Sequence, residues 1–254
     1  MKKLSFIAAG ALALATLSGS AVAASGPTKI GFSAEPYPPF SYKSPDGKWT
    51  GFELEMQRAV CKAASLDCQP TPTAWSGIIP ALQIGKIDGI MNSMTITPER
   101  LKKIDFTHPY MVSKIDFVVP QGMKLASLDD LKGKVLGVQG ATLAATYTNA
   151  HVRPLGIQVK VYNQQEQLTR DLEAGRVDAM IADSVYTKTF VLHHKDFKDV
   201  VAPGGPVQEI AIGVRKGDTA LENKLNAGIE TVLKDGTCKK LSMQFVHFDV
   251  CAQP

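Results

Sequence analysis

Two segments of this chain, Leu82–Ser93 and Leu172–Asp183, match each other in residue type and order. In each, the pattern predicts a helix that ends at a left-handed glycine, followed by a buried strand. A second pair of segments, Lys29–Ser33 and Val135–Gln139, is also similar. We interpret these pairs as two α/β lobes of related architecture. The alternative is a chance similarity between common helix–glycine–strand units.

Short apolar segments alternate with helical patterns along the chain, which is typical of α/β domains. A chain of 254 residues is long enough for one large domain or two small ones. The predicted strands are 29–33, 89–92, 134–138, 159–162 and 179–182. The predicted helices are 54–64, 77–85, 98–103, 143–150, 164–173 and 221–235.

Residues 1–24 have the pattern of a signal peptide. Lys2 and Lys3 precede an apolar run over Leu4–Leu17, and Ala21–Ala23 supplies the small residues of a cleavage site. The run is too short and too rich in Ala, Ser and Gly for a membrane span, and no later segment has the required length. We therefore predict cleavage near Ala23 or Ala24 and export to a bacterial periplasm.

Charge and cysteine content exclude several classes of function. Without the two signal lysines, 28 basic residues become 26 against 24 acidic ones, a net charge of +2, which argues against a nucleic-acid partner. Four cysteines in an exported chain favour disulfides. Of the three connectivities, local pairing of Cys61 with Cys68 and of Cys238 with Cys251 is the most economical. Wide spacings without a histidine pair disfavour zinc, and no metal or other cofactor is expected.

Polar side chains follow the predicted strands where open α/β sheets bind ligands, beyond the carboxyl ends. In the first lobe these are Glu35, Asn92 and Ser93, and in the second they are 139–142 and Asp183. The sequence pattern contains no Ser/His/Asp set, phosphate-binding glycine loop or metal cluster. We therefore predict a binding site and not an enzyme.

Arg100 is the most informative single residue. Thr97 and Pro98 predict a helix start, and Arg100 falls in its first turn, where the helix dipole disfavours a cation. We interpret this arginine as the binding residue for a carboxylate. The alternative is a surface arginine on an ordinary amphipathic helix.

An amino acid presents a carboxylate and an ammonium group close together, and the candidate residues suit both. Arg100 can hold the carboxylate through two parallel N–H bonds, and Thr142, at a second predicted helix start, can reach it from the other lobe. Asp183 can accept from the ammonium, with Ser93 and Thr95 adding hydroxyl groups. The alternatives are that Thr142 is a plain helix cap and Asp183 a solvated cap.

The side-chain end of the ligand would meet loop residues. Tyr37 and Trp75 lie in loops after first-lobe strands, where they can sandwich a flat or cationic side chain. Glu35 would face the distal charge of a basic ligand. Met94 suits either the core or the pocket lining. Ordinary packing is the alternative for both aromatic residues, and simple exposure is the alternative for Glu35.

At the level of whole motifs, the chain resembles the periplasmic substrate-binding proteins of polar amino-acid ABC transporters, above all the lysine/arginine/ornithine, histidine and arginine binders. The resemblance covers nearly all of residues 28–250. The motifs that carry it are Glu35–Phe40, Gly51–Glu53, Trp75–Leu82, Ile90–Arg100, Asp105–Thr107, Pro109–Tyr110, Gly137–Thr142, Gly175–Asp178 and Gly213–Gly217.

The resemblance implies a type II two-lobed fold with two crossover strands and the ligand cleft between the lobes. Lobe 1 would comprise 25–113 and 209–254, and lobe 2 would comprise 114–208. It implies a monomer that gives a free amino acid to an inner-membrane permease, and a Cys61–Cys68 disulfide. By motif matching, Arg100 and Thr142 would hold the carboxylate, Asp183 and Ser93 the ammonium, and Tyr37 and Trp75 the side chain. Together with Glu35, Asn92, Met94 and Thr95, these residues form the predicted ligand-binding set.

This sequence departs from the family pattern in three places. The loop between Glu35 and Tyr37 is one residue shorter than in close relatives, Leu143 replaces a residue that is often polar, and Cys238 and Cys251 suggest an additional link at the tail. Two other functions stay open. One is a periplasmic dehydratase of prephenate- or arogenate-like acids, with Glu35 as general acid. The other is a soluble sensory co-receptor.

Overall fold

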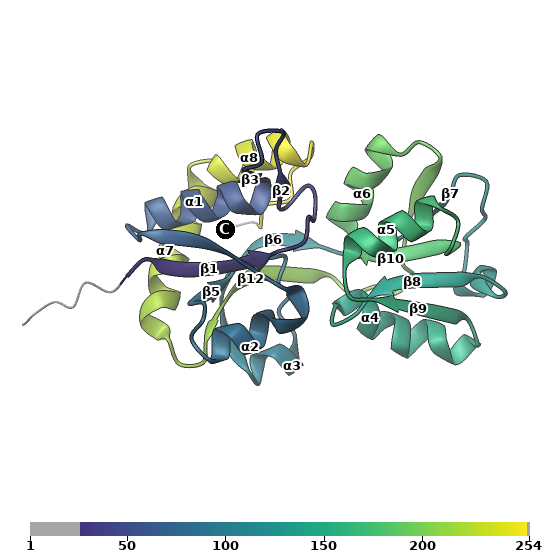
Figure 1. Ribbon diagram of the computed structural model, residues 1–254, viewed down its shortest axis with the longest axis horizontal. Helices are drawn as coiled ribbons and strands as arrows, with labels where there is room; N and C mark the ends of the chain where they lie inside the picture. Colours follow the sequence, from purple (N-terminus) through teal and green to yellow (C-terminus); the bar gives the residue numbers. More distant parts are fainter. Residues whose placement is uncertain (1–25, 253–254) are drawn as a thin grey trace, which may run out of the picture.

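The computed structural model describes residues 26–252, which form two α/β lobes side by side (Figure 1). The signal peptide predicted for 1–24 lies outside the described residues. The sheet of the first lobe has the order β4 (Cys68–Thr73), β1 (Thr28–Ser33), β5 (Gly89–Ile90), β12 (Gln208–Arg215) and β6 (Ile104–Ser113). The sheet of the second lobe has the order β9 (Gln158–Tyr162), β8 (Val135–Gln139), β10 (Ala179–Asp183), β7 (Ile115–Pro120) and β11 (Phe197–Val201).

The two sheets have the same arrangement, as the repeated sequence predicts. In each, a first strand is parallel to both neighbours, β1 to β4 and β5, and β8 to β9 and β10. The next strand, β12 or β7, is antiparallel. The repeated glycines, Gly85 and Gly175, have φ of 74° and 68°. The repeated aspartates make equivalent hydrogen bonds to the first strand of each lobe. Asp88 accepts from Lys29 N at 2.9 Å, and Asp178 accepts from Val135 N at 2.8 Å.

Helices cover both faces of each sheet. In lobe 1, α1 (Phe52–Ala63), α7 (Thr219–Lys234) and α8 (Thr237–Phe245) pack together on one face, and α2 (Ile78–Gln83) and α3 (Pro98–Leu101) lie on the other (Figure 1). In lobe 2, α5 (Gln165–Glu173) and α6 (Ser184–His193) lie on one face, and α4 (Leu143–Tyr147) packs on the opposite one. A short ribbon of β2 (Tyr42–Lys43) and β3 (Trp49–Thr50) follows β1.

Several elements do not appear among the predicted ranges. Among the strands and α-helices, these are β2, β3, β4, β6, β7, β11, β12, α6 and α8. Three of the strands contain proline, which weakens a strand pattern: β4 holds Pro70 and Pro72 and lies at the edge of its sheet, β6 holds Pro109, and β7 ends with Pro120. The helix predicted over 143–150 changes at Thr148 from α-helix to π-helix.

The chain crosses between the lobes twice, as the type II fold requires. It first leaves β6 at Ser113 and enters β7 at Ile115, and it later returns from β11 to β12. Gln208 joins the two crossings, since its Nε2 donates to Lys114 O at 2.6 Å. We propose 113/114 and 208/209 as the lobe boundaries; the first lies between β6 and β7, and the second lies at the start of β12.

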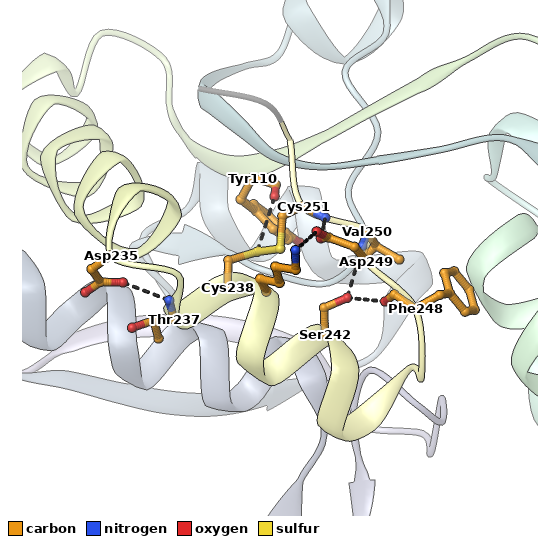
Figure 2. Close-up of a disulfide and its surroundings, with 10 residues drawn as sticks. Tyr110, Asp235, Thr237, Cys238, Ser242, Phe248, Asp249, Val250 and Cys251 are labelled. Carbon is orange, nitrogen blue, oxygen red and sulfur yellow. Dashed lines mark hydrogen bonds and ion pairs between the residues drawn. A yellow bond between two sulfur atoms is a disulfide. The ribbon is translucent and has the colours of Figure 1, made fainter.

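Both local disulfides are present. Cys61 pairs with Cys68 across the end of α1, and Cys238 pairs with Cys251 (Figure 2). The second bond links the tail to α8, and the tail also pairs with β6, where Val112 N donates to Val250 O at 3.1 Å. The predicted link at the tail is therefore confirmed. Over residues 26–252, the structure contains no helix of the length and hydropathy that crossing a bilayer requires.

Candidate ligand-binding site

A cavity lies between the lobes at the carboxyl ends of β1, β5, β8 and β10, where the strand-end argument predicts it. Nine of the ten proposed ligand residues line it, and Met94 is the exception. The lining consists of Ser33, Glu35, Pro36, Tyr37, Trp75, Asn92, Ser93, Thr95, Arg100, Ile115, Gln139, Thr142, Leu143, Ala144, Gln165, Ile181, Ala182, Asp183 and Gln208.

Hydrogen bonds to distant segments of the chain hold the lobe-1 wall, residues Asn92–Arg100. Asn92 is 3% exposed, and its Oδ1 accepts from Ser33 N at 2.9 Å. Ser93 N donates to Glu53 Oε1 at 2.6 Å. Thr95 Oγ1 donates to Gln208 Oε1 at 2.8 Å. These bonds fix the loop that follows β5.

Arg100 connects the two walls. Thr97 caps α3 and Pro98 occupies its first turn, as predicted, and Thr97 Oγ1 accepts from Arg100 N at 3.2 Å. The guanidinium donates to Thr95 O at 2.8 Å and to Ala141 O, in the other lobe, at 3.0 Å. Burial lowers the pKa of Arg100 to about 10, so the side chain stays cationic at neutral pH. Arg100 is therefore a half-buried cation at the cavity.

The lobe-2 wall, residues Gln139–Ala144 with Asp183, is built on helix caps. Thr142 Oγ1 accepts from Ala145 N at 3.1 Å at the start of α4. Asp183 Oδ1 accepts from Val185 N at 2.8 Å at the start of α6, and its Oδ2 accepts from Gln208 Nε2 at 3.3 Å. Both residues are caps, as the alternative interpretation held, and both also face the cavity.

The charge of Asp183 is controlled by burial. Desolvation raises the pKa of Asp183 to about 6, while hydrogen bonds from the start of α6 act in the opposite direction. A carboxylate in this position is poorly solvated and gains from a cation placed beside it. The cavity therefore holds a half-buried cation, Arg100, and a half-buried acid, Asp183.

The remaining end of the cavity is aromatic and acidic. Trp75 Nε1 donates to Gly140 O of the other lobe at 3.3 Å, and its ring lies 5.5 Å from the Arg100 guanidinium. Tyr37 stacks on Tyr186 with ring centroids 5.0 Å apart. Glu35 lines the same cavity and accepts from Gln164 Nε2 at 3.4 Å, despite the shortened loop.

Met94 lies away from the cavity. Its side chain is 1% exposed and packs in the lobe-1 core with Ile78 and Leu82. Ser93 and Thr95 of this loop line the cavity. Met94, which lies between them, instead directs its side chain toward the sheet. Met94 is therefore a core residue beneath the site.

Some lining residues were absent from the predicted set. Ser33 ends β1, so the strand-end rule could have included it. Gln208 begins β12, a strand that the sequence pattern did not reveal. Gln165 begins α5, and its contact with the cavity depends on how the lobes meet.

Comparison with known proteins defines the class. Residues 29–248 match the bacterial extracellular solute-binding proteins, family 3, and the chain belongs to this family. The L-arginine-binding protein of Pseudomonas aeruginosa is 39% identical, with 98% of each chain covered. The L-cystine-binding protein TcyJ of Escherichia coli strain K12 is 35% identical over 84% of this chain and 80% of that one.

A solved structure supports the same assignment. An ancestral arginine-binding protein bound to arginine superposes with a TM-score of 0.79 at 32% identity, covering 87% of this chain and 98% of that one. The fold is therefore that of the type II periplasmic binding proteins, and the relatives are amino-acid binders with different ligands.

Proposed function

We propose that this protein is the periplasmic substrate-binding component of an amino-acid ABC transporter. It captures a basic amino acid, with arginine as the first candidate and lysine, ornithine and histidine as the others. It then delivers the ligand to an inner-membrane permease as a monomer. The observation that carries the proposal is the placement of Arg100 and Asp183 on facing walls of one cavity.

Arg100 and Asp183 account for the part that all amino acids share. A carboxylate beside Arg100 would replace the carbonyl oxygens of Thr95 and Ala141 as acceptors with a charged one, which is a stronger interaction. An ammonium beside Asp183 would compensate a desolvated acid, and Ser93 and Thr95 add polar groups nearby.

Glu35, Tyr37 and Trp75 account for the choice of side chain. All three line the cavity, and together they offer one carboxylate and two aromatic rings. This combination suits a side chain that is long, flat or cationic. The arginine-binding relatives support the same choice, whereas the cystine-binding relative shows that the family accommodates other ligands.

A ligand panel tests the proposal. The protein is unfolded, freed of bound ligand, refolded, and studied by thermal shift and calorimetry with arginine, lysine, ornithine, histidine, glutamine, glutamate and cystine. A ligand at a hundred times its Kd stabilises the fold by about 2.7 kcal/mol. We expect the largest shift with a basic amino acid.

The ligand panel and two further assays separate the proposed function from the two alternatives, a dehydratase and a sensory co-receptor. A shift confined to glutamine, glutamate or cystine would contradict the choice of a basic ligand. The protein is also incubated with prephenate and with arogenate, and turnover of either would contradict a pure binding function. Uptake of arginine by membrane vesicles carrying the cognate permease separates a transport receptor from a co-receptor, which would bind without supporting uptake.

A further inference from the structure

Glu53 is a buried acid directly behind the lobe-1 wall. It is 2% exposed, does not line the cavity, and belongs to the Gly51–Glu53 motif, for which the proposed function gives no role. Its Oε1 accepts from Ser93 N and from Tyr110 Oη, and its Oε2 has no partner within residues 26–252. A buried, partly unpaired carboxylate costs free energy that an apolar residue of similar size would avoid.

The fold fixes this carboxylate in place. Glu53 lies in the first turn of α1, where the helix dipole favours an anion. The turn is anchored by Glu53 N, which donates to Phe40 O at 3.0 Å. Gly51 caps the helix with φ of 127°, and a Cβ at that residue would collide with Phe40 O. The carboxylate therefore has little freedom to move away from Ser93.

Ser93 has a backbone conformation that needs support. Its φ of 46° lies in the left-handed region, which is unfavourable for residues other than glycine. In this conformation its N–H points into lobe 1 toward Glu53, while Ser93 and Thr95 line the cavity. The bond from Ser93 N to Glu53 thus stabilises the conformation that the binding loop requires.

We propose that Glu53 is a positioning residue of the ligand site: its carboxylate binds Ser93 N from behind and holds the loop Ser93–Thr95 in the conformation that faces the ligand ammonium. Glu53 does not contact the ligand, and it acts through Ser93. This inference rests on the proposed amino-acid binding.

The electrostatic surroundings agree with this role. Burial raises the pKa of Glu53 to about 7, hydrogen bonds from Tyr110 and Ser93 N lower it in part, and the charge of Asp183 raises it. The titratable groups around it are Tyr110 from β6, Asp183 from the start of α6, and Tyr37 from the loop after β1. A ligand ammonium near Ser93 and Asp183 would therefore favour the charged form of Glu53.

The test is a double-mutant cycle between Glu53 and Ser93, with Kd for arginine measured by calorimetry at pH 8. Glu53→Leu removes the acceptor, and we expect Kd to rise at least 30-fold. Glu53→Gln keeps an acceptor oxygen, and we expect a rise of less than tenfold. Ser93→Gly tolerates the left-handed conformation unaided, so in that background Glu53→Leu should cost less than fivefold.

A matched control uses the same helix. Gln57 lies one turn beyond Glu53, is 2% exposed, and donates to Ile30 O instead of the binding loop. Gln57→Leu should change Kd less than twofold. Thermal unfolding of each variant without ligand shows whether it is folded. If Glu53→Leu does not fold, Glu53→Asp replaces it in the test. Aspartate keeps the charge, but its shorter side chain does not reach Ser93 N, so we expect Kd for arginine to rise at least tenfold.

The outcomes separate the two proposals. If the parent protein binds no amino acid, the proposed function fails, and the inference fails with it. If the parent binds arginine but the folded Glu53 variants bind within twofold of it, only the positioning role is wrong. An equal loss for Glu53→Leu in the parent chain and in the Ser93→Gly background would also overturn it, since the effect would then not pass through Ser93.

Discussion

The two walls of the cavity are held by different kinds of interaction. The lobe-1 wall depends on partners far away in the sequence: Asn92 on Ser33, and Ser93 on Glu53. The lobe-2 wall depends on neighbours, because Thr142 and Asp183 cap the helices that begin next to them. The strands beneath the two walls are nevertheless equivalent.

This difference indicates how the site divides its tasks. Helix caps place Thr142 and Asp183 with few requirements on the rest of the fold, so their geometry is local. Both walls contain a non-glycine residue with positive φ, Ser93 at 46° and Ala141 at 58°, but the lobe-1 wall also needs a buried acid, Glu53, from 40 residues away, so it is more easily disturbed. We expect substitutions behind the lobe-1 wall to affect binding indirectly, and substitutions in the lobe-2 wall to affect it mainly through direct contact.

The largest effect is expected from Arg100, which joins the walls. Arg100→Ala should weaken every amino-acid ligand at least a hundredfold, about 3 kcal/mol, because it removes a charge-assisted, two-pronged interaction. Arg100→Lys keeps the charge without the planar fork and should recover only part of the affinity. Calorimetry with arginine, lysine and histidine checks both variants. A loss for one ligand alone would place Arg100 at the side-chain end of the site.

Asp183→Asn separates capping from binding. Asparagine caps a helix about as well as aspartate, so the melting temperature without ligand should change little. Binding should weaken about 30-fold, roughly 2 kcal/mol, because the ammonium loses a charged acceptor. A variant with lower stability and unchanged Kd would show that Asp183 is only a cap.

The pH dependence of binding should come mainly from Asp183. Its pKa of about 6 in the ligand-free protein falls when an ammonium binds beside it, so binding releases a proton. Affinity for arginine should therefore decrease as the pH falls from 7 to 5, by up to about tenfold per unit below pH 6. Asp183→Asn should remove most of this dependence of the affinity on pH. An unchanged slope would show that another group causes the pH dependence, and Glu53 would be the first candidate.

Glu35→Gln should have the smallest and most selective effect. We expect a loss of about threefold to tenfold, near 1 kcal/mol, for arginine and lysine, since Glu35 already has Ser33 and Gln164 as hydrogen-bond partners. Free glutamine, as a ligand, should bind equally well to the unaltered protein and to Glu35→Gln. Calorimetry with the three ligands checks the division. An equal loss for all three would give Glu35 a structural role.

The sequence was sufficient where the structure is local. The repeated segments predicted both left-handed glycines, Gly85 and Gly175, and both cysteine pairs were correct. The helix starts at Thr97 and Thr142 could be predicted because a cap depends on the residues next to it, whereas the helix that Asp183 caps, α6, was not among the predicted ranges.

The sequence was insufficient where contacts are distant. No local pattern indicates that Glu53 lies behind Ser93 or that Gln208 reaches Thr95, because both contacts depend on the packing of whole strands and helices. Met94 was placed in the site because its neighbours belong there. The backbone path between Ser93 and Thr95, which no periodic rule describes, turns it into the core.

The central claim is that the cavity recognises the carboxylate and the ammonium of an amino acid through Arg100 and Asp183. The most direct measurement compares, by calorimetry on the unaltered protein, arginine with agmatine, which lacks the carboxylate, and with deaminated arginine, which lacks the α-ammonium. Both analogues should bind at least a hundredfold more weakly than arginine, since each leaves one buried charge without its partner. Agmatine binding as tightly as arginine would contradict the account.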